Sequence, residues 1–126
     1  MKQKRQQHTD DRRRDPRVDQ NIPLKIFHED GDIVTETANI SRSGVYCRVG
    51  KYIEPMTKFK INFLLPVKKN GKPSSKKISC EGAVVRIEKI AGSGEFNLAI
   101  FFNNITQRDA ESIADYVSTY LEQQVG

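Results

Sequence analysis

Hydrophobic and polar residues alternate along most of the chain between residues 22 and 102. The clearest example is the stretch 58–65, in which every second residue is apolar: Phe59, Ile61, Phe63 and Leu65. A period of two predicts strands with one side against a core and the other toward solvent. The same pattern predicts further strands over residues 22–27, 33–38, 45–49, 78–90 and 96–102.

Turn-forming residues separate these strands. Glycine, asparagine, aspartate and serine predict turns or loops at residues 29–32, 39–44, 66–77 and 91–94. Gly82 interrupts the long strand 78–90 and predicts a bulge or bend there. On that strand we expect two faces, one with Ala83, Val85 and Ile87 and the other with Val84, Arg86 and Glu88.

The period changes near the end of the chain. Apolar residues recur at helical spacing there: Ala110, Ile113, Ala114, Val117 and Leu121. Thr106 is suited to an N-cap and Asp109 follows three residues later, so we predict a helix over 107–123. Six strands followed by one helix predict an all-β fold with a C-terminal helix, arranged as a small antiparallel barrel or sandwich.

Length and composition limit the functional classes. The 126 residues fit one domain, with residues 1–11 as a flexible polar tail and 12–126 as the folded part. No signal peptide and no apolar run long enough for a membrane span is present, which favours a soluble, cytoplasmic protein. Cys47 and Cys80 lie in apolar segments and are expected to be buried rather than metal-binding, since His8 and His28 are distant. We find no catalytic constellation, and we do not expect an enzyme or a cofactor.

Positive charge is concentrated in two places. The net charge is +5, and residues 1–18 carry seven Lys or Arg against three Asp. The second concentration is a lysine cluster without acidic neighbours: Lys68, Lys69, Lys72, Lys76 and Lys77. Such surplus charge suits an anionic partner such as a nucleotide, a nucleic acid or a membrane surface. We interpret the lysine cluster as a solvated loop, because it contains no aromatic residue to stack on a base.

The first concentration is an arginine-rich arm. Arg12, Arg13, Arg14 and Arg17 fall within six positions, and Pro16 prevents a helix from running through them. We therefore expect an extended arm that presents guanidinium groups. These groups match the geometry of phosphate and stack on flat rings.

Two motifs together resemble the PilZ domain family. Arg13-x-x-x-Arg17 matches its RxxxR motif, and Asn39-x-Ser41-x-x-Gly44 matches its [D/N]xSxxG motif. The strand order after the motifs agrees as well. The resemblance implies a six-stranded antiparallel β-barrel with helical additions, and a receptor for the bacterial second messenger cyclic di-GMP.

The resemblance also implies roles for individual residues. Arg13 and Arg17 are expected to contact phosphates and guanines, Asn39 and Ser41 to contact guanine edges or phosphate, and Gly44 to leave the floor of the site free. Arg12, just ahead of the motif, suggests that two ligands bind as a stacked pair. Secondary contacts are expected from Arg14, Asp15 and Arg42. The ligand would order the arm and pass the signal to an unidentified downstream protein.

Departures and alternatives remain. Ala99 stands where many family members carry glycine, at a position we expect to lie away from the motifs. A basic β-barrel that binds RNA or DNA through the arm and the lysine loop is a second hypothesis, but we do not expect a nucleic acid partner. A PilZ fold that has lost the ligand and acts only as an adaptor is a third.

Overall fold

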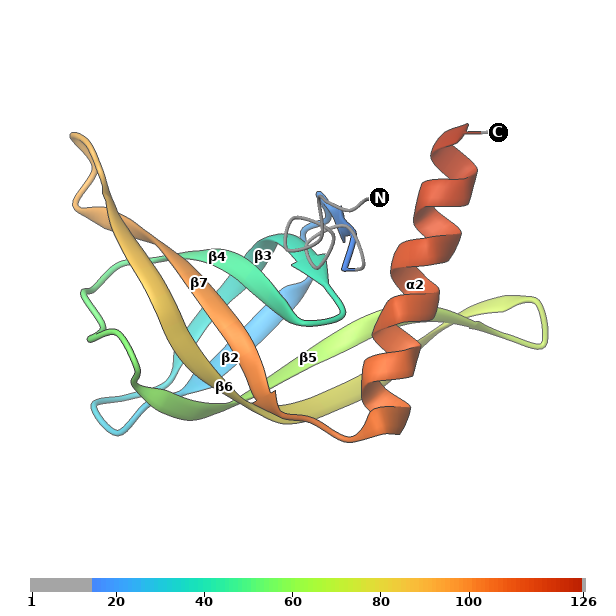
Figure 1. Cartoon of the computed structure of the whole chain (residues 1–126), viewed down its shortest axis with the longest axis horizontal. Helices are drawn as coiled ribbons and strands as arrows, with labels where there is room; N and C mark the ends of the chain where they lie inside the picture. Colours follow the sequence, from blue (N-terminus) through green and yellow to red (C-terminus); the bar gives the residue numbers. More distant parts are fainter. Residues whose placement is uncertain (1–14, 126) are drawn as a thin grey trace, which may run out of the picture.

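The computed structural model describes residues 15–125 and shows strands followed by a helix (Figure 1). Arg12, Arg13, Arg14 and the predicted tail, residues 1–11, lie outside the described residues. The strands are β1 (Arg17–Val18), β2 (Pro23–Phe27), β3 (Ile33–Ser41), β4 (Gly44–Val49), β5 (Lys58–Lys69), β6 (Lys72–Ile90) and β7 (Glu95–Asn104), and the helix is α2 (Gln107–Val125). The predicted class, mainly β-sheet with a C-terminal helix, is confirmed.

The strands pair antiparallel throughout and form a closed circuit. The order β3-β2-β5-β6-β7-β4 returns to β3, because β3 pairs with β2 through its first residues and with β4 through its last. The prediction of six strands was wrong by one, since β1 adds a seventh strand. It pairs with β3 beside Ile40 and Ser41, past the point where the β2 pairing ends.

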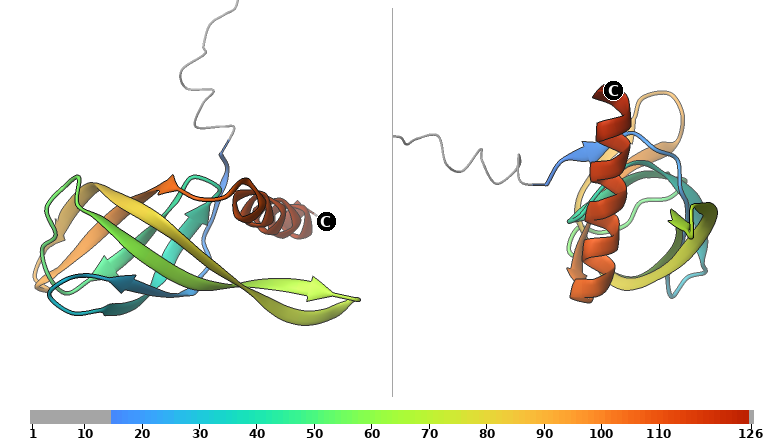
Figure 2. Two further views of the ribbon diagram at one scale, coloured as in Figure 1. Left: turned by 90° about the horizontal axis from the view of Figure 1, so that it is seen from below. Right: turned by 90° about the vertical axis from the view of Figure 1, so that its right-hand side faces the viewer.

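The circuit encloses the hydrophobic core, and α2 lies across one end of it (Figure 2). The largest fully buried side chains come from nearly every strand: Leu24, Ile26, Ile40, Ile61, Leu65, Ile78, Leu98 and Ile100. Ile113 and Val117 of α2 are buried against them. Each such side chain contributes roughly 1.5–3 kcal/mol when it leaves water. The predicted apolar stripe of the helix is therefore a part of the core.

The predicted loop at 66–77 is wrong, because β5 and β6 continue through it. Their pairing extends to Lys69 and Lys72, and only Asn70 and Gly71 form the turn. Asn70 has a φ of 54° and Gly71 a φ of 77°. Two successive positive φ angles match the two-residue turn that twists with a hairpin, for which Asn-Gly is the preferred sequence.

Strand β6 is irregular at two places. The predicted bulge at Gly82 is confirmed by a register shift between Glu81 and Gly82, and a second shift lies between Val84 and Arg86. The second shift was not predicted, and it reverses the alternation of side chains. Ala83 is 6% exposed and Val85 is 55% exposed, so these two residues do not share one face as predicted.

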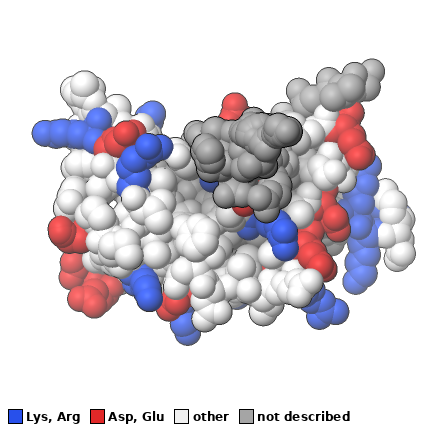
Figure 3. All heavy atoms as spheres, in the orientation of Figure 1, with Lys and Arg blue, Asp and Glu red and all other residues white. Residues whose placement is uncertain are grey.

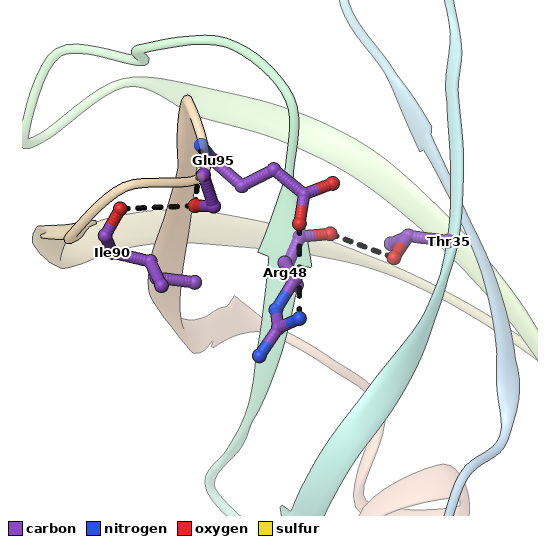
Figure 4. Close-up of polar contacts among 5 residues, drawn as sticks. Thr35, Arg48, Ile90 and Glu95 are labelled. Carbon is purple, nitrogen blue, oxygen red and sulfur yellow. Dashed lines mark hydrogen bonds and ion pairs between the residues drawn. The ribbon is translucent and has the colours of Figure 1, made fainter.

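Side chains also connect strands at the far end of the circuit (Figure 4). Glu95 of β7 forms an ion pair with Arg48 of β4, with Oε1 and Nη1 3.7 Å apart. The carbonyl oxygen of Arg48 accepts a hydrogen bond from the hydroxyl of Thr35 in β3 at 2.7 Å. In the adjoining turn, Ser93 Oγ donates to the carbonyl oxygen of Ile90 at 2.9 Å. These contacts hold β3, β4 and β7 together. They lie on the far side of the register shift that interrupts the β3–β4 pairing between Thr37 and Asn39.

The helix begins where the sequence predicted. Thr106 Oγ1 accepts a hydrogen bond from the backbone N–H of Asp109 at 3.1 Å, as an N-cap does. No helix within residues 15–125 is long and apolar enough to cross a membrane. Cys47 and Cys80 are free and buried, as expected, and burial raises the pKa of both thiols to about 12.

Candidate ligand-binding site

The second motif lies at the junction of β3 and β4. We predicted a turn over residues 39–44, but β3 continues to Ser41 and β4 begins at Gly44, so only Arg42 and Ser43 form the turn. Ser41 Oγ accepts a hydrogen bond from the backbone N–H of Ser43 at 3.1 Å. Ser41 is 0% exposed. In this structure its hydroxyl therefore stabilises the turn.

Gly44 is required by the contact between β4 and β7. It pairs with Phe101, and a Cβ atom at this position would overlap the carbonyl oxygen of Ile100. The adjacent Ser43 carbonyl oxygen accepts a hydrogen bond from Phe102 N at 2.9 Å. Only glycine allows this close approach. The packing of β4 against β7 therefore requires glycine at position 44, whereas we had expected this glycine only to keep the floor of the site free.

Arg17 is held next to the second motif by β1. Its strand partner is Ser41, and its Nη1 donates a hydrogen bond to Asn39 Oδ1 at 2.6 Å. Its guanidinium carbon lies 4.8 Å from the centre of the Tyr46 ring. Burial lowers the pKa of the Arg17 guanidinium, while the neighbouring Tyr46 and Asp15 raise it. The structure thus brings Arg17 and Asn39 together, as the motifs predicted.

A second guanidinium group, that of Arg86, also contacts Tyr46. Arg86 Nη2 donates a hydrogen bond to the Tyr46 hydroxyl at 2.7 Å, and its guanidinium carbon lies 5.9 Å from the ring centre. A cation over an aromatic face is stabilised by roughly 0.5–1 kcal/mol at an exposed site. We call Arg17, Asn39, Tyr46 and Arg86 the arginine cluster.

Sequence reasoning missed Tyr46 and Arg86 as site residues. Their meeting depends on the non-sequential strand order β4-β7-β6, which no local sequence pattern indicates. Ala99 of β7 lies between them in register and is 5% exposed. Ala99 thus neighbours Tyr46 and Arg86, which neither motif contains.

The remaining predicted residues are peripheral or undescribed. Asp15 is half-buried just ahead of β1, and Arg42 is exposed in the turn between β3 and β4. Arg12, Arg13 and Arg14 precede the described part of the chain. Within the described part, two arginines, one amide and one aromatic ring meet on the outer face of the sheet. This combination can bind an anion that also carries a flat ring.

A comparison with protein-family models identifies the family of this chain. The family model described as PilZ domain matches residues 11–119. No curated protein matches the chain. The inhibitor of motility MotI/DgrA of Bacillus subtilis is 20% identical, with a TM-score of 0.74; the match covers 97% of this chain and 52% of that one, so this chain spans about half of that relative.

Two further solved structures are similar. The PilZ domain of YcgR from Escherichia coli, solved with c-di-GMP, is 13% identical, with a TM-score of 0.61 and coverage of 90% of this chain and 94% of that one. The PilZ domain of CeSA from a cellulose-synthesizing bacterium is 14% identical, with a TM-score of 0.51 and coverage of 83% and 97%. At these identities the structural matches show a shared fold.

Proposed function

Because this chain belongs to the PilZ domain family, whose model matches residues 11–119, we propose that it binds cyclic di-GMP and relays the signal to a partner protein. The observation that carries the proposal is the contact between the two family motifs. Arg17 of the first motif donates to Asn39 of the second and covers the Tyr46 ring. The proposal thus rests on one residue of each motif, Arg17 and Asn39, which lie in contact.

The chemistry of the cluster suits this ligand. Cyclic di-GMP has two phosphates and two guanines, and arginine donates two parallel hydrogen bonds to phosphate oxygens or to guanine O6 and N7. Arg17 and Arg86 stand on the ring of Tyr46, so a purine can stack on their planar guanidiniums. In this proposal Asn39 exchanges its bond with Arg17 for a ligand contact, while Ser41 and Gly44 hold the strand geometry beneath.

The N-terminal arginines complete the proposed site. Arg13 supplies the other half of the first motif, and Arg12 supplies the charge that favours a stacked pair of ligands. Arg14, Asp15 and Arg42 remain secondary contacts in the proposal. The partner is reached by binding, with the ligand ordering the arm that leads into β1.

The wider setting follows from the family. PilZ domains are regulatory and binding modules, and no catalytic family is matched. We infer that the closed circuit of strands is the β-barrel of the family and that the protein acts in the bacterial cytoplasm. The PilZ domain of YcgR was solved with c-di-GMP, which supports the choice of ligand.

Calorimetric titration with cyclic di-GMP tests the proposal. We expect saturable binding by the wild type, loss of binding by Arg13→Ala/Arg17→Ala, and unchanged binding by Arg108→Ala, which removes an exposed arginine from α2. A ratio near two ligands per chain supports the stacked pair. Absence of heat with wild-type protein at micromolar concentration contradicts the proposal, and favours an adaptor without ligand.

A further inference from the structure

A second basic region lies away from the arginine cluster. We call residues 66–77, at the end of the β5–β6 pair, the lysine hairpin; it carries Lys68, Lys69, Lys72, Lys76 and Lys77. No acidic residue occurs from Pro66 to Cys80, and no arginine occurs between Arg48 and Arg86. The charge here is entirely of the lysine type.

The lysine hairpin projects from the circuit of strands (Figure 1). Strand β2 pairs with β5 only as far as Phe63, and β7 pairs with β6 only as far as Glu81. Beyond these points β5 and β6 pair only with each other, and the hairpin extends past α2. A projecting ribbon can touch a planar surface, which a concave site cannot.

Most of this charge has no partner within the described chain. Lys76 is occupied, since its Nζ lies 3.5 Å from Asp109 Oδ1 and 2.7 Å from Ser112 Oγ. The other four lysines are exposed and form no ion pair within residues 15–125: Lys68, Lys69, Lys72 and Lys77. Their positive charge is therefore available to an anionic surface.

Two features argue against a protein strand or an acidic protein segment as the partner. Pro66 and Pro73 lack an N–H donor, and together with the lysines they protect the ribbon from pairing with another strand. The groove between the hairpin and α2 is lined by Lys68 on one side and Asp115 on the other. Acidic side chains gather along α2 beside these lysines, so an acidic segment seated there would be repelled (Figure 3).

A nucleic acid is also a poor match. The segment 66–77 contains no arginine to grip a phosphate or base edge and no aromatic residue to stack on a base. It offers flexible point charges on apolar stems instead. Leu64, which is 52% exposed, lies opposite Lys77 at the base of the hairpin and adds an apolar group to the same surface.

We propose that the lysine hairpin is a docking site for the surface of a lipid bilayer that contains anionic lipids. Lysines near such a surface are attracted individually and without a required geometry. The hairpin tip, with Lys69 and Lys72 flanking the turn, makes the first contact. This inference does not depend on cyclic di-GMP, because the hairpin and the arginine cluster share no residue.

Co-sedimentation with lipid vesicles tests it. The full chain is mixed with vesicles of phosphatidylcholine alone, or of phosphatidylcholine with about one third phosphatidylserine. We expect binding only to the second kind. Lys69→Gln/Lys72→Gln should weaken it about 25-fold, which corresponds to ~1 kcal/mol for each lysine.

The matched control removes the same charge elsewhere. Lys51→Gln/Lys89→Gln replaces two lysines outside the hairpin, and we expect binding within about twofold of the wild type. Equal losses in both double variants would show that only net charge matters and would overturn the proposal. So would equal binding to both kinds of vesicle. Tighter binding to a 20-base-pair DNA duplex, lost in the hairpin variant alone, would replace the bilayer by nucleic acid.

Discussion

The arginine cluster and the lysine hairpin are both basic, yet they hold their charges in opposite ways. In the cluster, Arg17 and Arg86 are fixed by an amide oxygen, a hydroxyl and an aromatic ring. In the hairpin, Lys69 and Lys72 stand exposed beside a two-residue turn. Fixed arginines can recognise one ligand geometry, whereas free lysines respond only to charge density. Net charge alone would not separate the two functions.

The largest effect is expected from the glycine that supports the cluster. Gly44→Ala places a Cβ against the Ile100 carbonyl oxygen, which belongs to the backbone and cannot rotate away. We expect a loss of about 3 kcal/mol in the free energy of unfolding, measured in urea. Gly50→Ala is the control, since nothing lies within 4 Å of its added Cβ. Equal stability of the two variants would contradict the close approach of β4 and β7.

The difference between arginine and lysine can be tested in both regions. Arg17→Lys keeps the charge but loses the planar fork that reaches Asn39. We expect the affinity for cyclic di-GMP to fall by about 2 kcal/mol, measured by calorimetry. Lys69→Arg/Lys72→Arg should leave vesicle binding within about twofold, because charge is retained. If Arg17→Lys binds as the wild type does, the cluster acts by charge alone and the comparison fails.

A smaller effect is expected from the ring between the two guanidiniums. Tyr46→Leu removes the face on which Arg17 and Arg86 are positioned. Loss of this cation–π contact should weaken cyclic di-GMP binding by about 0.5–1 kcal/mol. Tyr52→Leu, at an exposed tyrosine packed against Phe96, should leave the affinity unchanged. A similar loss in both variants would show that the ring of Tyr46 has no special role.

The smallest effect is expected when the lysine hairpin is changed and binding of cyclic di-GMP is measured. Lys69→Gln/Lys72→Gln should leave the affinity for cyclic di-GMP within about twofold, since exposed charges beyond a Debye length of ~8 Å are largely screened. Calorimetry at physiological salt measures this. A tenfold loss would mean that the lysine hairpin takes part in ligand binding.

Much of the fold could be predicted from the sequence because periodicity is a local property. The alternation around Phe59 and Ile61 identified β5, and the helical spacing around Ile113 identified α2. The bulge between Val84 and Arg86 escaped prediction, since a register shift is decided by the neighbouring strand. The extent of the lysine hairpin escaped it too, because Pro73, Ser74 and Ser75 after Asn70-Gly71 are also typical of a longer loop.

Local sequence motifs likewise predicted only part of the arginine cluster. The two motifs pointed to Arg17 and Asn39, which the structure joins by a hydrogen bond. Tyr46 and Arg86 are 40 positions apart, and nothing local in the sequence connects them. Their contact follows from the placement of β7 between β4 and β6, which only the folded chain reveals.

An amide NMR titration with cyclic di-GMP tests the central claim most directly, because it reports on both basic regions in one experiment. We predict that the largest shifts fall on β1, β3 and β4 around Arg17, Asn39 and Tyr46, while the amides of Lys69 to Lys72 do not move. Largest shifts in the lysine hairpin, or no shift at saturating ligand, would contradict the assignment of the arginine cluster as the ligand site.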